Sequence, residues 1–154
     1  MLPRAYPMLL FQENVVKLAE LQRDLGGYDH LLHPEREFLR EGCLQKLSRK
    51  GYQQRMFFLF SDLLIYANRT TSPSLHFRVH GQMMLKDVTV LDSEPRLGQE
   101  HCFNLYDGKK AVLVAASTHA EKLCWMEDIA EAAQVYSQLS SSVKLGVDDR
   151  HKKL

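Results

Sequence analysis

Cysteine is scarce in this 154-residue chain, and its three residues, Cys43, Cys102 and Cys124, contain no CxxC pair. An odd number argues against a disulfide framework, and the spacing argues against the usual zinc sites. The sequence also lacks a run of about 20 apolar residues, the length that a membrane-spanning helix needs. The first eleven residues hold one arginine and an apolar run broken by Pro7, which makes a poor secretory signal. These absences predict a protein of the reducing cytosol.

The motifs that mark common active sites are also missing. The sequence holds no GxSxG elbow, no P-loop, no HExxH zinc motif and no DxDxDG calcium loop. The seven histidines are scattered, and the four-residue spacing of His76 and His80 suits a metal on a helix but not on the strand expected there. We therefore predict that the chain is not an enzyme and that it holds no metal and no cofactor.

The net charge is close to zero, with 20 Lys and Arg against 19 Asp and Glu. A chain of this balance has no global field that would attract nucleic acid. The aromatic residues Phe57, Phe58 and Phe60 lie in a run too apolar for a base-stacking platform, so core is the better interpretation. We expect no nucleic acid partner, and any anion site must come from local clustering of cations.

The first regular element that the sequence predicts is a helix within residues 11–27. Its end is marked by Gly26-Gly27, and residues 28–40 follow as a charged linker that contains Pro34. The apolar residues at helical spacing are Val15, Leu18, Leu21 and Leu25. Because so short a helix is marginal in water by itself, we expect it to pack on the rest of the chain or to fray, and contact with a partner protein is the third alternative.

From Gly42 to about Ala116 the chain is rich in β-branched and aromatic residues, which are typical of strands. Turn signals such as Lys50-Gly51 and Asp107-Gly108 separate the runs. Seven short strands with tight connections predict one antiparallel sandwich or barrel. The predicted strands are 42–48, 55–60, 63–68, 76–85, 87–92, 101–106 and 110–116.

After these strands the periodicity changes to that of a helix. Thr118 as N-cap and Glu121 three residues later form a capping box. The apolar stripe of this helix consists of Trp125, Ile129, Ala132 and Tyr136. We place its end before the serines at 140–142 and predict a flexible tail over 140–154. A helix with this stripe is suited to close the open end of a small barrel.

This order of elements resembles the pleckstrin homology (PH) fold. "EGCLQKL" (41–47) is similar to the first PH strand, and "QRMFFLFSDLLIY" (54–66) is similar to the second and third strands. "STHAEKLCWMEDI" (117–129) resembles the closing helix, with Trp125 at the family's most typical position. The resemblance implies a mostly β fold with α: a seven-stranded antiparallel barrel or sandwich capped by a C-terminal helix and preceded by an N-terminal one. It places the PH domain at 41–139.

The upstream sequence resembles the junction between the DH and PH domains of Dbl-type Rho exchange factors. "ENVVKLAELQRDLGG" is similar to the last DH helix, and "REFLREGCLQKL" continues into the PH domain as in the FARP type (FERM, RhoGEF and pleckstrin-domain proteins) and, more distantly, the FGD type. Only this junction helix, within segment 1–27, resembles a DH domain. We therefore expect this chain by itself not to catalyse nucleotide exchange.

The PH resemblance also implies a lipid-headgroup site, because three loops share one end of the barrel in that family. Several converging cations hold phosphate by charge-assisted hydrogen bonds, and each contributes roughly 1 kcal/mol near an anionic leaflet. The cations expected to gather there are Lys46, Arg49, Lys50, Arg55, Arg69, Lys109 and Lys110.

The sequence departs from the pattern of tight phosphoinositide binders, which have Lys or Arg, any residue, then Arg at the start of the second strand. Here Gln53-Gln54-Arg55 places a glutamine at the first cation. The loss of one charge-assisted contact costs about 1.5–3 kcal/mol, or roughly ten- to a hundredfold in affinity. We therefore predict weak, poorly selective binding. Alternatively, the cations only solvate hairpin ends and discourage edge pairing.

The resulting prediction is a non-catalytic PH module of Rho GTPase signalling that binds anionic phospholipid or phosphoinositide weakly. It would be cytoplasmic and peripheral at the inner membrane leaflet or the cytoskeleton. The alternative is a regulatory protein-interaction domain of a Rho exchange factor, with a Rho-family GTPase or an exchange-factor domain as partner.

Overall fold

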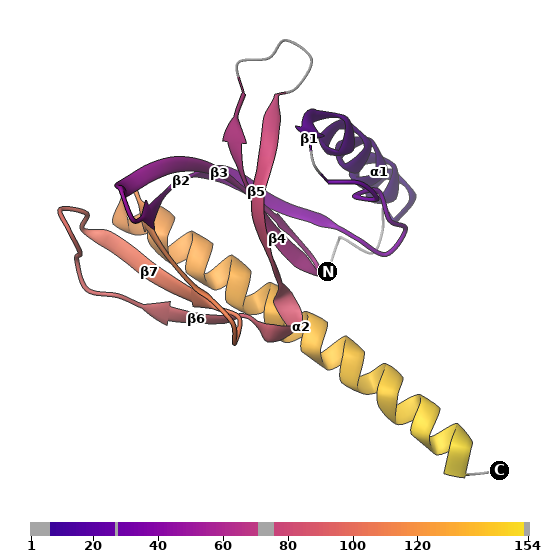
Figure 1. Cartoon of the computed structure of the whole chain (residues 1–154). Helices are drawn as coiled ribbons and strands as arrows, with labels where there is room; N and C mark the ends of the chain where they lie inside the picture. Colours follow the sequence, from indigo (N-terminus) through magenta and orange to yellow (C-terminus); the bar gives the residue numbers. More distant parts are fainter. Residues whose placement is uncertain (1–6, 27, 71–75, 153–154) are drawn as a thin grey trace.

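The computed structural model describes residues 7–26, 28–70 and 76–152, which form two α-helices and one eight-stranded sheet (Figure 1). The elements in chain order are α1 (Pro7–Asp24), β1 (Leu25–Gly26), β2 (Phe38–Ser48), β3 (Gly51–Phe60), β4 (Leu63–Arg69), β5 (Phe77–Met84), the 3₁₀ turn η2 (Leu85–Asp87), β6 (Thr89–Asp92), β7 (His101–Tyr106), β8 (Ala111–Ala116) and α2 (His119–Lys152). Neither of the described helices combines the length and the apolar character that crossing a membrane requires.

The sheet has the strand order β1-β5-β4-β3-β2-β8-β7-β6 and is antiparallel except where β1 pairs with β5. β2 is the strand that joins its two halves, because it pairs with β3 along its length and with β8 at Gln45 and Lys46. In Figure 1 the β6–β7 half therefore lies apart from the β3–β5 half, with α2 running between them. The predicted mostly β fold with its two flanking helices is confirmed.

Several predicted strand bounds need correction. β2 begins at Phe38 and β3 at Gly51, each four residues before the predicted start, because the two strands form one long hairpin. The strand predicted from residue 87 starts at Thr89, since Leu85–Asp87 form η2. The two-residue strand β1 was not predicted, because two residues carry no periodicity.

The main core lies between the two halves of the sheet and α2. Trp125 is only 1% exposed, and Ile129 is fully buried beside it. Gly42 leaves space for the indole: a Cβ at this position would lie 3.2 Å from Cζ2 of Trp125. The guanidinium of Arg40 covers the indole at 5.0 Å from the ring centroid and pairs with Asp128 at 3.0 Å. Helix α2 thus closes the sheet as a cap.

The start of α2 shows half of the predicted capping box. The Glu121 N–H donates to the hydroxyl of Thr118 at 3.1 Å, but the Glu121 carboxylate accepts from the Ser117 hydroxyl at 2.8 Å. The predicted end of this helix is wrong, since α2 continues to Lys152. Serines have only a moderately lower helix propensity than alanine, and extending an existing helix is easier than starting one. Flexibility of segment 140–154 stays a prediction.

Helix α1 packs on the outer face of β3, β4 and β5, which is one of the three alternatives predicted for this helix. Its apolar residues Leu18 and Leu21 are buried in a second cluster with residues of the sheet such as Phe58 and Ile65. Asn14 ties α1 to the start of β2, because its side-chain oxygen accepts a hydrogen bond from the Phe38 N–H at 2.8 Å. These contacts hold α1 in one orientation against the sheet.

Candidate functional site

The candidate site arises where the inward-facing side chains of β2 and β3 change from apolar to polar. Alternate residues of a strand face the same side, and the register pairs Leu44 with Arg55 and Lys46 with Gln53. Leu44 and Phe57 belong to the buried core, so Lys46 and Arg55 are the next positions of these inward rows. The cations therefore emerge at the rim of the core, away from the end that Trp125 closes.

These side chains surround a hollow of about 340 Å³. None of the described residues that line it is Asp or Glu. The residues that line it are Lys46, Ser48, Arg49, Lys50, Gln53, Arg55 and His80. Together with Lys110, the cations Lys46, Arg49, Lys50 and Arg55 are called the basic mouth below.

Lys110 reaches the basic mouth from the turn between β7 and β8. Its Nζ donates a 3.3 Å hydrogen bond to the hydroxyl of Tyr66. The Nζ atoms of Lys46 and Lys110 lie 5.5 and 5.6 Å from the centroid of the Tyr66 ring, within the range of cation–π attraction. Gly81 makes this placement possible, because a Cβ at that position would overlap the Tyr66 hydroxyl. Tyr66 thus holds two cations at one end of the sheet.

The cations of the basic mouth repel one another. The pKa of Lys46 is lowered by burial and then by the charges of Arg55 and Lys110. The pKa of His80 is lowered by burial and then by Arg55 and Lys46. A bound anion would relieve this repulsion, which is the electrostatic condition for an anion site.

Arg55 is partly engaged by its neighbours. One terminal nitrogen donates to the side-chain oxygen of Gln53, and the other donates to the carbonyl of Gln54 at 3.0 Å. Its Nε is buried and has no hydrogen-bond partner among the described residues. The glutamine that replaces a cation in the sequence pattern therefore also restrains the guanidinium that remains.

Two of the predicted site residues, Arg69 and Lys109, are not brought into the basic mouth. Arg69 lines a neighbouring hollow that also contacts Arg55, and its guanidinium lies 5.8 Å from the ring centroid of Phe77. The backbone N–H of Lys109 donates to the carboxylate of Asp107 at 3.0 Å, within the turn between β7 and β8. No contact of the described residues links its side chain to the basic mouth.

Sequence reasoning missed His80 and Tyr66 as members of the site. The register between β4 and β5 shifts from Tyr66–Gly81 to Ala67–Val79, so His80 is the extra residue of a bulge. Its ring stacks on Tyr66 with centroids 6.2 Å apart. A glycine inside a predicted strand signals a bulge or a close approach, so Gly81 was the clue available in the sequence.

Comparisons with known proteins identify the family to which this fold belongs. The family model for the PH domain matches residues 38–134. The chain is 48% identical over 130 residues to mouse FERM, ARHGEF and pleckstrin domain-containing protein 2, covering 84% of this chain and 12% of that protein. It is 45% identical over 143 residues to chicken FERM, ARHGEF and pleckstrin domain-containing protein 1, covering 93% and 14%. Mouse FYVE, RhoGEF and PH domain-containing protein 6 is 32% identical over 126 residues, covering 82% and 9%. The chain thus spans only a small part of these relatives.

Solved structures with the same fold include DH/PH domains. The truncated linker-DH/PH domains of p115-RhoGEF give a TM-score of 0.67 at 16% identity, covering 82% of this chain and 42% of that one. The DH/PH domain of human ARHGEF11, in a complex with human RhoA and its inhibitor, gives 0.64 at 18% identity, covering 82% and 40%. Autoinhibited Vav1 gives 0.67 at 20% identity, covering 83% and 24%. At these identities the likeness concerns the fold.

Proposed function

Because this chain belongs to the PH domain family, we propose that its basic mouth binds the phosphate groups of anionic phospholipids and phosphoinositides. The observation that carries this proposal is the hollow into which Lys46, Arg49, Lys50 and Arg55 converge without a carboxylate among its described lining. Converging cations are what phosphate recognition requires. The module would sit in the cytoplasm, peripheral to the inner leaflet.

The expected affinity is low. Five cations at roughly 1 kcal/mol each supply about 5 kcal/mol, which corresponds to a Kd of about 0.2 mM. The restraint of Arg55 by Gln53 acts in the same direction, because part of its hydrogen-bonding capacity is already used. Membrane attachment would therefore need a second contact, such as another domain of a longer protein. We propose no catalytic role for the chain. We propose that it acts in Rho GTPase signalling, because the names of its relatives include ARHGEF or RhoGEF.

Vesicle co-sedimentation tests the lipid role. Chain binding to phosphatidylcholine vesicles is compared with binding to vesicles that also contain phosphatidylserine or a phosphoinositide. The variant Lys46→Glu/Arg55→Glu should lose the anion-dependent binding. The matched control Arg23→Glu/Lys86→Glu changes the net charge equally at exposed positions outside the basic mouth and should retain it. Equal binding to neutral and anionic vesicles, or equal losses in both variants, would remove the lipid role.

A second candidate function is a regulatory contact with a Rho-family GTPase or an exchange-factor domain. The observation that favours it is the packing of α1 on the sheet, through which a neighbouring domain would be held in one orientation. A pull-down with purified Rho-family GTPases or a DH domain tests it. A partner that stays bound to Lys46→Glu/Arg55→Glu would support this function as separate from the lipid site, and no binding to any of them would refute it.

A further inference from the structure

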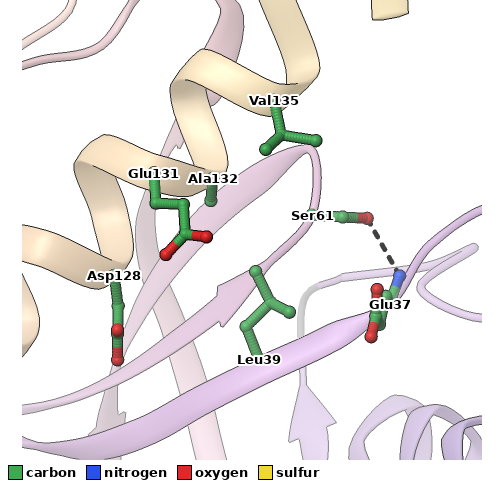
Figure 2. Close-up of a pocket in the computed structure, with 7 residues that line it drawn as sticks. All are labelled: Glu37, Leu39, Ser61, Asp128, Glu131, Ala132 and Val135. Atoms are coloured by element: carbon green, nitrogen blue, oxygen red, sulfur yellow. Dashed lines mark hydrogen bonds between the residues drawn. The ribbon is translucent and has the colours of Figure 1, made fainter. Parts of the chain in front are cut away.

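A second hollow lies at the other end of β2, between this strand, the β3–β4 turn and α2 (Figure 2). It measures about 340 Å³ and adjoins a larger one of about 840 Å³ that continues along α2. The two share Glu37, Ser61 and Val135, so they form one groove. We call it the acidic groove, with an apolar floor of Leu39, Val135 and Leu139 and a rim that includes Glu35, Glu37 and Glu131.

The floor of the acidic groove consists of apolar side chains that the core does not use. Leu39 is 41% exposed, Val135 is 48% exposed and Leu139 is 62% exposed. Leu39 lies at the irregularity between Phe38 and Arg40 in the β2–β3 register, and such bulges redirect a side chain. Val135 and Leu139 are four residues apart and share one face of α2.

The rim carries excess negative charge. Asp62 and Asp128 also line the groove, but they are paired with arginines at 2.9 and 3.0 Å. No ion pair of the described residues engages Glu35, Glu37 or Glu131. None of the described lining residues is Lys or Arg. The acidic groove is therefore the electrostatic opposite of the basic mouth.

The wall of the groove is formed before any partner arrives. The Glu37 N–H donates to the Ser61 hydroxyl at 2.9 Å, as the dashed line in Figure 2 marks, and the Ser61 N–H donates to the Glu37 carbonyl at 2.8 Å. Both backbone groups of Glu37 are thus fixed while its carboxylate is left for another contact. A preorganised wall lowers the entropy lost on binding.

We propose that the acidic groove binds a basic amphipathic segment of a partner protein. Apolar side chains of the segment would cover Leu39, Val135 and Leu139, and its lysines or arginines would face Glu37 and Glu131. Charge complementarity selects this occupant, because carboxylates without counter-charges repel anionic membranes and nucleic acids. The site is separate from the lipid proposal, since Leu39 and Lys46 lie seven residues apart on β2, or about 23 Å at 3.3 Å per residue.

A titration with a synthetic peptide tests the proposal. The probe is two LKKLLKL repeats, and the control peptide has the same composition with its leucines scattered around the helix. Backbone NMR signals of the ¹⁵N-labelled chain should shift around Leu39 and Val135 in a saturable way, and the control peptide should bind at least tenfold more weakly. Shifts centred elsewhere, or equal binding of both peptides, would overturn the proposal.

Matched variants separate the groove from bulk charge. Glu37→Gln/Glu131→Gln should weaken probe binding at least tenfold, as expected for two central polar contacts. Glu20→Gln/Glu94→Gln changes the net charge equally at exposed positions elsewhere and should leave the affinity within twofold. Equal losses in both pairs would refute the site. Self-association of the chain that the groove variant abolishes would also refute it, because the occupant would then be a second copy.

The floor is tested separately. Val135→Ser/Leu139→Ser should also lower the affinity for the probe at least tenfold, and because both side chains are exposed, the thermal unfolding midpoint should change little. Leu91→Ser is the control, since Leu91 is similarly exposed on β6. An unchanged affinity in the floor variant would show that the apolar residues take no part, which contradicts an amphipathic occupant.

Discussion

Replacing Gln53 by lysine should turn a weak anion site into a stronger one. In the present chain the Gln53 side chain accepts a hydrogen bond from Arg55 and contributes no charge to the hollow. A lysine at this position cannot accept that bond, so the guanidinium of Arg55 is released. The new ammonium also restores the cation that the sequence pattern of tight phosphoinositide binders contains.

The size of the effect follows from two opposing contributions. One added charge-assisted hydrogen bond contributes about 1.5–3 kcal/mol. Lys46 lies directly opposite Gln53 in the β2–β3 register, and like charges across a strand pair cost about 0.2–1 kcal/mol. We therefore expect an affinity gain of about tenfold for anionic vesicles, together with a loss of up to about 1 kcal/mol in the free energy of unfolding without lipid.

Co-sedimentation with phosphoinositide vesicles and urea unfolding measure the two effects. The control is Gln54→Lys, which adds the same charge one residue along β3 and therefore on its opposite face. Gln54→Lys should raise the affinity at most twofold. If the two variants gain equally, the basic mouth acts only as diffuse charge; if Gln53→Lys gains nothing, the hollow is not the anion site.

Three further predictions concern the cap, the bulge and the titration of the site. Trp125→Ala should lower the free energy of unfolding by about 3–5 kcal/mol in urea titrations, because the indole is fully packed. Leu123→Ala, on the exposed side of α2, should lower it by less than about 1 kcal/mol, and similar losses in the two variants would contradict the role of Trp125 in the cap. Gly81→Ala should cost about 1–3 kcal/mol in thermal unfolding, because the new methyl group displaces Tyr66, and an unchanged midpoint would contradict that close approach. The pKa of His80 lies below its usual 6.5 in the folded chain, so as the pH drops the unfolded state takes up the proton at a higher pH than the folded state does. The stability of the folded chain should therefore fall as the pH drops below about 6.5. A bound phosphate raises the pKa of His80, so anionic vesicles should bind more tightly over the same pH range. His80→Gln should remove the pH dependence of both stability and vesicle binding, and a pH dependence that survives in this variant would refute the assignment of these effects to His80.

Much of the fold was predictable because its signals are local. Alternating apolar residues and turn residues such as Asp107-Gly108 mark the strands, and β7 (His101–Tyr106) has the predicted bounds. Thr118 marks the start of α2 through a hydrogen bond within one turn. The end of α2 was not predictable in the same way, because serines weaken a helix without stopping it.

The candidate site was predictable only in part. The sequence identified a basic cluster and the departure at Gln53, but it placed Arg69 and Lys109 with the other cations. Only the strand register decides that Lys46 and Arg55 face one hollow while Arg69 lies over Phe77. The bulge that brings His80 to Tyr66 also depends on pairing between two strands.

By itself, the amino-acid sequence determined the types of the elements, their order and the family resemblance, because each depends on neighbours along the chain. The tertiary structure decided which charges meet. Lys46 and Lys110 are brought to the same tyrosine ring, and Leu39 and Val135 to the same groove, by folding of the sheet and packing of α2. Contacts between residues so far apart in sequence follow from register, bulges and packing, which no local pattern of residues specifies.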